Sequence, residues 1–160
     1  MNRFRLLGLA ALLCVGPIAW ATQHSEDVKR HGDMAMGFSH LKTTHHFRLT
    51  STGGSIEVSA NDPKDTESRD QIRMHLQHIA KAFKEGDFGA PHTTHGRVPP
   101  GVPEMQRLKA GIEYQYEEKE AGGRVVIKTA NADALAAVHE FLRFQIDDHE
   151  TGDSKTVQQQ

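Results

Sequence analysis

Two segments of alternating apolar and polar residues, each interrupted by a pair of glycines, constrain the fold of this chain most strongly. Residues 44–60 read THHFRLTSTGGSIEVSA, and residues 112–130 read IEYQYEEKEAGGRVVIKTA. Apolar side chains recur at every second position on both sides of each glycine pair. Such alternation places one set of side chains on a buried face, and a Gly-Gly pair between two alternating runs is typical of a β-hairpin. We therefore expect two hairpins.

Each expected hairpin is followed by a segment with helical periodicity. In residues 61–88 the apolar stripe consists of Ile72, Leu76, Ile79 and Phe83, and in residues 131–153 it consists of Leu135, Val138, Leu142 and Ile146. Aspartate or asparagine residues that can cap a helix stand before each stripe. The chain is thus predicted to be α+β, with two ββα repeats. These repeats should form a four-stranded, mostly antiparallel sheet with both helices on one face.

The N-terminus has the three parts of a secretory signal peptide. Arg3 and Arg5 precede an apolar run, which ends in the small-x-small sequence Ala19-Trp20-Ala21. This run is shorter than the ~20 residues that a transmembrane helix needs. We therefore expect residues 1–21 to be removed and the protein to be exported, either periplasmic or extracellular, without a stable membrane span.

The remaining chain divides into four predicted parts. Residues 22–41 lack apolar periodicity and are expected to form a flexible arm that contains histidine and methionine. Residues 42–150 are expected to form one ββα–ββα domain. Its connector, residues 87–111, is rich in proline and is predicted to be irregular, with a short helix around 104–110. Residues 151–160 are expected to be a polar tail.

Composition excludes several function classes. The only cysteine, Cys14, lies within the signal, so the exported chain has no disulfide and no thiolate ligand. Removal of Arg3 and Arg5 from 19 basic residues leaves 17, against 21 acidic residues. A nucleic-acid-binding protein usually has a basic surplus or a basic stripe, and this chain has neither. No nucleic-acid partner is therefore expected.

Histidine is the residue type that suggests a function. The chain has 11 histidines, and all of them follow the predicted signal. Imidazole is the commonest protein ligand of transition metals, and the methionine thioether adds a soft ligand that suits Cu(I). A metal ion is therefore the expected partner. Copper is the leading candidate, with zinc or nickel as alternatives.

The first two candidate sites lie in the arm. Cleavage after Ala21 would create the N-terminus Thr22-Gln23-His24, whose amine, amides and third-position imidazole form a planar nitrogen set for Cu(II) or Ni(II). Further along, the arm offers His31, Met34, Met36 and His40 as loosely spaced ligands for a soft ion. The alternative for both is a solvated leader segment without a ligand.

Other candidates lie in the folded domain. His75 and His78 are three residues apart on the first helix, and His92 and His95 have the same spacing in the connector. His45 shares the inner face of its strand with Phe47, and His139 lies within the second apolar stripe. We therefore expect His45, His75 and His139 to form or border one metal site, with His46 or His78 contributing from its rim. The alternative is that each is a hydrogen-bonded core histidine.

Catalytic motifs are not evident. His139-Glu140 begins a zinc-protease motif, but Arg143 stands where its second histidine belongs. No Gly-x-Ser-x-Gly sequence occurs either. An exported metal-binding protein, for copper binding, buffering or delivery, is therefore the leading interpretation. The alternatives are a small exported enzyme, with or without a metal, and a non-metal binding or assembly module that uses the open face of the sheet.

Four stretches carry a resemblance to a known group of proteins: MGFSHLKTTHHFRL, SANDPKDTESRDQIRMHLQHIAKAF, PPGVPEMQRLK and HEFLRFQIDDHETGD. They resemble small exported bacterial proteins without an established activity, many of which carry the name aspartate carbamoyltransferase. True carbamoyltransferases look like longer proteins with two α/β domains and a Ser-Thr-Arg-Thr phosphate-binding turn, and this sequence lacks that turn. The resemblance implies one domain and supplies no catalytic residues.

Overall fold

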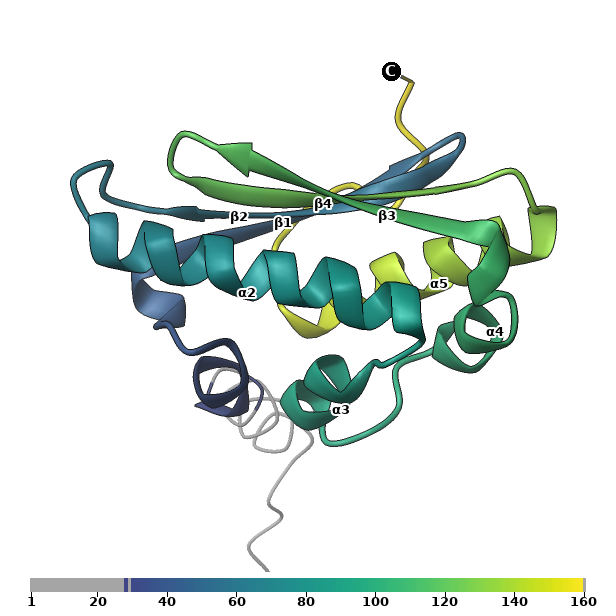
Figure 1. The fold of residues 1–160 in the computed structure, drawn as a ribbon, viewed down its shortest axis with the longest axis horizontal. Coiled ribbons are helices and arrows are strands. Elements are labelled where there is room, and N and C mark those ends of the chain that lie inside the picture. Colours follow the sequence, from purple (N-terminus) through teal and green to yellow (C-terminus); the bar gives the residue numbers. More distant parts are fainter. Residues whose placement is uncertain (1–27, 29, 160) are drawn as a thin grey trace, which may run out of the picture.

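A computed structural model describes residues 28 and 30–159 of the chain. The predicted signal peptide and the candidate ligands Thr22 and His24 lie outside these residues. The described elements follow the order ββα, connector, ββα (Figure 1). Among the described helices, none is long and apolar enough to cross a membrane.

The four strands form one antiparallel sheet, as the sequence predicts. The first hairpin comprises β1 (Thr43–Thr50) and β2 (Gly53–Ala60), and the second comprises β3 (Ile112–Lys119) and β4 (Gly122–Thr129). The strand order is β1-β2-β4-β3, so the second strands of the two hairpins pair at the centre of the sheet. Both long helices lie on one face of the sheet (Figure 1). The predicted fold class is confirmed.

The two long helices begin and end at the residues that their sequences favour. Helix α2 (Thr66–Glu85) is capped by the Asp65 side chain, which accepts a hydrogen bond from Ser68 N, and it ends at Gly86 in the left-handed region, with φ 82°. Helix α5 (Ala132–Asp148) is capped by Asn131, which accepts from Ala134 N. Capping side chains satisfy amide groups that the first turn of a helix leaves unpaired.

The two repeats are packed crosswise. Helix α2 packs mainly on β3 and β4, and α5 packs mainly on β1 and β2, so each helix covers the hairpin of the other repeat. The glycine pairs make room for this arrangement. A side-chain carbon at Gly54 would collide with Leu142 of α5, and one at Gly123 would press on Leu76 of α2. Neither ββα unit can therefore bury its own sheet face alone.

The connector is more regular than its prolines suggest. It contains α3 (Gly89–His95), α4 (Val102–Arg107) and a 3-10 turn, η2 (Lys109–Gly111). The short helix predicted around 104–110 corresponds to α4 and η2, but α3 lies in the part of the connector that was predicted to be irregular. Proline is tolerated in the first turn of a helix, where its missing N–H has no partner to lose. Pro91 and Pro103 both stand in such first turns.

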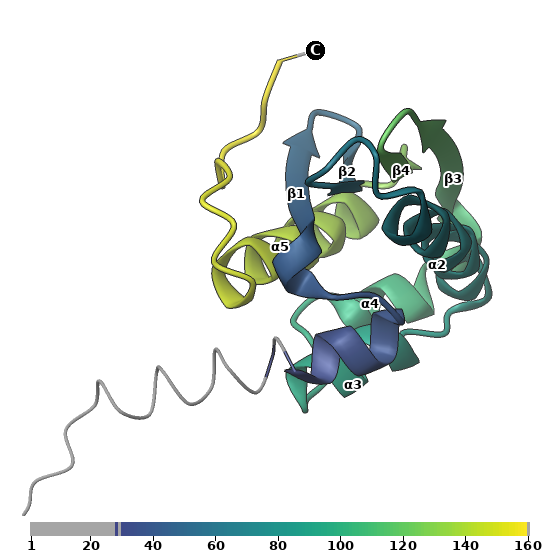
Figure 2. The same ribbon diagram turned by 90° about the vertical axis from the view of Figure 1, so that its left-hand side faces the viewer.

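Part of the predicted flexible arm is helical. Residues 30–36 form a helix, a 3-10 turn, η1 (His40–Lys42), follows it, and the buried ring of Phe38 lies between them. Gly37, at φ 79°, reverses the chain after the helix. Phe38 belongs to the core cluster, and Met36 packs against it. This short segment covers one end of the sheet–helix interface beside α3 (Figure 2).

The polar tail also makes specific contacts. Gln158 N donates to Leu49 O at 2.9 Å, and Gln158 forms a parallel bridge with Thr50 at the edge of β1. Closer to α5, Asp153 accepts hydrogen bonds from the backbone N–H of Phe47 and from the His46 ring, each at 2.9 Å. The tail thus covers part of an edge strand whose N–H and C=O groups would otherwise be unpaired.

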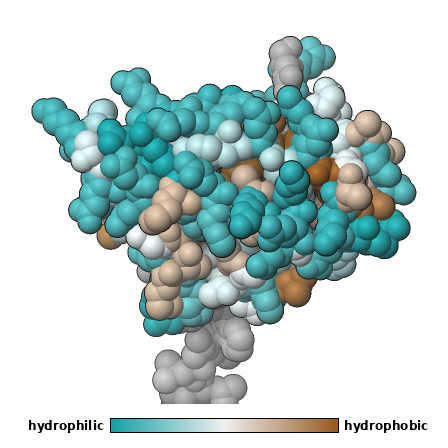
Figure 3. All heavy atoms as spheres, viewed as in Figure 1, coloured by the Kyte–Doolittle hydropathy of each residue, from teal (hydrophilic) through white to brown (hydrophobic). Residues whose placement is uncertain are grey.

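The surface is largely polar. On the face seen in Figure 3, hydrophilic residues predominate and apolar residues are scattered among them. Large apolar side chains that are exposed in the described residues are Met34, Leu41, Met74, Val98 and Val157. Single exposed apolar side chains are ordinary on a soluble protein surface and do not by themselves mark an interface.

Candidate functional site

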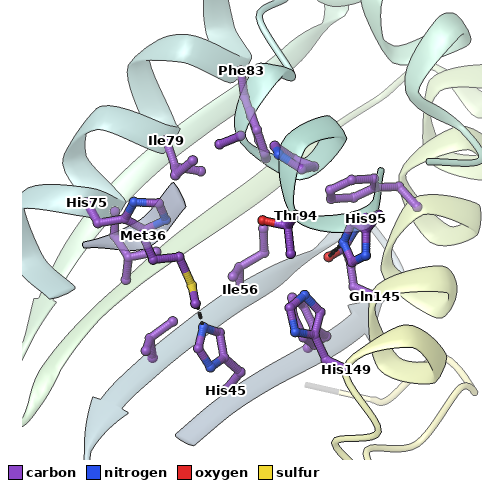
Figure 4. A pocket seen from close by; sticks show the side chains of 16 residues that line it. Met36, His45, Ile56, His75, Ile79, Phe83, Thr94, His95, Gln145 and His149 are labelled. Carbon is purple, nitrogen blue, oxygen red and sulfur yellow. Dashed lines mark hydrogen bonds between the residues drawn. The ribbon is translucent and has the colours of Figure 1, made fainter. Parts of the chain in front are cut away.

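A small cavity lies at one end of the sheet–helix interface, bounded by helix 30–36, β1, α2, α3 and α5. Its volume is about 60 Å³. Its floor is apolar and includes Ile56, Ile79, Phe83 and Phe141. The remaining wall carries four histidines (Figure 4). The side chains with nitrogen, oxygen or sulfur atoms that line it are Met36, His45, His75, Thr94, His95, Gln145 and His149.

Each of the histidines reaches the cavity because of its place in a regular element. His45 lies two residues before Phe47 on the inner face of β1, as the alternation predicts. His75 stands at the edge of the apolar stripe of α2. His95 is the last residue of α3, and His149 is the C-cap of α5. Histidines from four different elements therefore converge on one cavity.

The closest pair of potential ligand atoms joins the N-terminal segment to the sheet. His45 Nε2 lies 3.3 Å from Met36 Sδ, and His75 lines the same cavity (Figure 4). The His45 and His149 rings are nearly parallel, with centroids 5.6 Å apart. The His149 ring in turn meets the His95 ring edge-on at 5.0 Å. Met36, His45, His149 and His95 thus form a row in which each side chain neighbours the next.

Burial keeps three of these imidazoles neutral. It lowers the pKa of His45 to about 4, with a further lowering by His75 and His46. The pKa of His75 is also lowered to about 4, by burial and then by His78. For His149, burial followed by the charges of His45 and His95 lowers the pKa to about 3. A neutral imidazole has a free ring nitrogen, which is the form that binds metal ions.

His95 is held differently from the other three. Its Nδ1 donates to the Asp148 carboxylate at 2.6 Å, and its Nε2 lies 3.0 Å from Gln145 Oε1. The side chain of His95 has no exposed surface, and that of Asp148 is 7% exposed. The amide nitrogen of Gln145 is buried and has no hydrogen-bond partner in the described chain. With Nδ1 as the donor to Asp148, Nε2 is an acceptor, and exchange of the Gln145 amide oxygen and nitrogen would give it a donor and satisfy the buried amide nitrogen.

The structure does not bring His139 to this cavity. His139 lies near the other end of β1, where its Nε2 donates to the carbonyl oxygens of Thr50 and Gly53 at 2.9 and 3.0 Å. Both carbonyls belong to the first hairpin, so this ring ties α5 to the turn. Of the three histidines expected to share one site, His45 and His75 come together and His139 is a hydrogen-bonded core residue.

The remaining candidates in the described residues do not line the cavity. His46 lies on the opposite face of β1 and bonds Asp153. His78 and His92 are exposed, His31 is half-buried on helix 30–36, and the exposed fraction of Met34 is 70%. His40 lies in an adjacent pocket, where its ring bonds Asp33. Each of the two pairs with three-residue spacing therefore contributes one histidine to the cavity. His75 and His95 line it, and their partners His78 and His92 are exposed.

Sequence reasoning missed His149 and Gln145. His149 continues the apolar stripe of α5 one step beyond Ile146, at the spacing of three residues that this stripe already shows. That periodicity could have indicated an inward-facing ring. Gln145 has no comparable signal, because a glutamine beside an apolar stripe is usually a surface residue.

No arrangement of three or more His, Cys, Asp or Glu side chains within residues 28 and 30–159 forms a ready metal site. In comparisons with known proteins, no family model, curated protein or solved structure matches this chain. The resemblance to small exported bacterial proteins therefore stays a prediction, and the geometry of the cavity carries the functional argument.

Proposed function

We propose that this protein is an exported copper-binding protein, periplasmic or extracellular after removal of residues 1–21, and that it buffers or delivers Cu(I). The ion would be held by Met36 Sδ, His45 Nε2 and a ring nitrogen of His75. The observation that carries the proposal is the 3.3 Å approach of a thioether sulfur to an imidazole nitrogen in a cavity lined by neutral histidines.

The spacing of the first two donors suits a shared ion. A tetrahedral metal with bonds of 2.0–2.3 Å holds two of its ligand atoms about 3.5 Å apart. The observed N···S separation of 3.3 Å is close to that value. Small side-chain rotations would bring an ion between the two atoms, and His75 lines the same cavity as a further donor (Figure 4). This donor set contains only two histidines, because the third donor is a thioether. It is therefore not a cluster of three His, Cys, Asp or Glu side chains, of which none was found in the described residues.

The chemistry of the donors favours Cu(I) over harder ions. Thioether sulfur and neutral imidazole are soft or borderline ligands, and the lining contains no carboxylate at the Met36 end. A monovalent ion also has a lower desolvation cost than a divalent ion in an apolar cavity. Methionine and histidine are the soft ligands that remain usable in an oxidising compartment, where thiols are lost to disulfides.

The lowered pKa values extend the pH range of binding. Metal ions compete with protons for imidazole nitrogen. Because the pKa values of His45 and His75 are both about 4, protons compete little at pH 5. Cu(I) affinity should therefore be nearly constant from pH 7 to pH 5. A solvent-exposed histidine site, with pKa values near 6.5, would lose affinity over the same range.

The test is an anaerobic competition titration of the mature protein with the Cu(I) chelator bicinchoninate, repeated with Zn(II) and Ni(II). Met36→Leu, His45→Ala and His75→Ala should each weaken Cu(I) binding by at least tenfold, since each removes one ligand. Matched controls are Met34→Leu on the same helix and His78→Ala one turn from His75 on α2. Both controls should bind Cu(I) like the unmodified protein.

Two results would contradict the proposal. The first is an unmodified protein that removes no Cu(I) from the chelator. The second is a loss of binding that is equal in Met36→Leu and Met34→Leu, because only Met36 lines the cavity. Tighter binding of Zn(II) or Ni(II) than of Cu(I) would also move the function away from copper.

A further inference from the structure

A second pocket adjoins the cavity and shares three of its side chains. It has a volume of about 210 Å³, against about 60 Å³ for the cavity. Met36, His45 and His149 line both spaces. We call the larger space, which is also lined by His40, Thr43 and Thr44, the outer pocket. An ion that moves from the outer pocket to the cavity would pass directly between the proposed ligands.

His40 is oriented within this outer pocket by a carboxylate. Its Nδ1 lies 3.0 Å from each oxygen of Asp33, and its backbone N–H donates to Asp33 Oδ1 at 2.7 Å. With Nδ1 as the donor to Asp33, Nε2 is left as the free ligand nitrogen. Carboxylates that fix a ring in this way are a common feature around metal-binding histidines.

His40 is accessible from solution. The side chain of His40 is 32% exposed, whereas burial around His45 and His75 is sufficient to lower their pKa values to about 4. His40 can therefore meet a copper complex in solution, and Met36 and His45, which line both spaces, connect the outer pocket to the cavity.

We propose that the outer pocket is the loading site for copper, and that His40 Nε2 is the first ligand to take Cu(I) from its donor. The ion then moves to Met36 and His45 by exchange of one neutral ligand for another, without a change of oxidation state or release of a proton. Asp33 acts as the positioning residue for His40. This inference rests on the proposed copper site and adds its loading route.

Stopped-flow transfer of Cu(I) from bicinchoninate to the metal-free, full-length mature protein tests the route. His40→Ala should slow the transfer about tenfold, while the equilibrium affinity stays within about twofold of the original value. His40→Gln, which keeps a hydrogen bond to Asp33 and so preserves the turn, should be equally slow. Asp33→Ala should be intermediate, because the ring remains but is no longer held. His31→Ala is the matched control and should transfer at the original rate.

The outcomes separate the loading route from the copper site itself. If the unmodified protein takes up Cu(I) and both His40 variants match its rate, the route is refuted and the inner site stands. Equal losses of rate and affinity in the His40 variants would also refute the route, because His40 would then be a permanent ligand. An unmodified protein that takes up no Cu(I) would refute the inner site and the route together.

Discussion

Histidines at the two ends of the sheet–helix interface are buried in contrasting ways. His139, beside the turn of the first hairpin, gives its ring N–H to two backbone carbonyls. At the other end, no hydrogen-bond partner in the described chain is found for the rings of His75 and His149, and the only one found there for the His45 ring is the Met36 thioether. The first ring stabilises the fold, whereas the other three are arranged around an open space.

This difference shows how a structural histidine can be told from a candidate ligand. Burying a polar group costs free energy unless a hydrogen bond or a metal compensates for it. His139 receives that compensation from the backbone, so its presence needs no further explanation. Of the cavity histidines, His75 and His149 lack it and His45 has only a thioether partner, so the protein retains these three at a cost to its stability. Proteins commonly accept such a cost at a binding site.

Replacement of one histidine at each end tests whether the two kinds of histidine differ in their effect on the free energy of unfolding. His139→Leu should lower the free energy of unfolding by about 3 kcal/mol, because two buried carbonyls lose their donor. His75→Leu should change it by less than about 1 kcal/mol, or raise it, since no hydrogen bond is lost. Urea denaturation of the metal-free proteins at pH 7.5 measures both. Similar losses in the two variants would contradict the distinction.

Bound copper should stabilise the protein through the cavity end alone. A ligand present at 100 times its dissociation constant raises the free energy of unfolding by about 2.7 kcal/mol. We expect this gain in the unmodified protein and in His139→Leu, but not in Met36→Leu. Thermal unfolding with and without Cu(I) provides the measurement. A gain that disappears in His139→Leu would place His139 at the metal site after all.

Acid should destabilise the metal-free protein through the same three rings. Because their folded pKa values, about 4, 4 and 3, lie below the ordinary value of 6.5, the folded state binds fewer protons than the unfolded state between these values. Stability is therefore complete above pH 6.5 and falls as the pH is lowered towards 4. Each ring contributes about 2 kcal/mol of this loss at pH 5.

His149→Phe provides the variant for this acid dependence. It keeps an aromatic ring at the C-cap of α5 and removes one titrating group. Urea denaturation at pH 7.5 and pH 5 should show a smaller loss in this variant than in the unmodified protein, by about 2 kcal/mol. An identical loss in the two proteins would mean that His149 is not a buried neutral base.

The smallest expected effect concerns the two faces of β1, where His45 faces the cavity and His46 faces the tail. Asp153→Ala removes the acceptor of Phe47 N and His46 and should cost about 1–2 kcal/mol. Limited proteolysis should then cleave the chain after α5 more readily. Cu(I) affinity should be unchanged. A parallel loss of affinity would show that the outer face of β1 helps to hold the cavity.

Periodicity was sufficient to predict the fold, since period-two alternation and the helical stripes each describe a local pattern. It did not predict that each helix covers the other repeat, because the space above Gly54 and Gly123 matters only once both repeats are assembled. The helix at 30–36 was missed for a related reason. Met36 and Phe38 are single apolar residues whose burial depends on contact with the core of the assembled domain, not on a neighbouring stripe.

The site was predicted in part. Alternation placed His45 inward, and the stripe of α2 placed His75 at its edge, so both were correctly assigned to the interface. The same reasoning placed His139 inward but could not show that the carbonyls of Thr50 and Gly53 would meet its ring. His95 and His149 depend on how α3 and the end of α5 approach the sheet. Tertiary packing decides that approach, and a local sequence pattern does not record it.

The most direct test of the account is X-ray absorption spectroscopy of the Cu(I)-loaded protein, because it identifies the atoms bound to copper. We expect one sulfur and two nitrogen neighbours in the unmodified protein and in Met34→Leu. In Met36→Leu the sulfur contribution should be lost and the nitrogen contribution retained. A copper centre without a sulfur neighbour in the unmodified protein, or a sulfur signal that survives in Met36→Leu, would contradict the account.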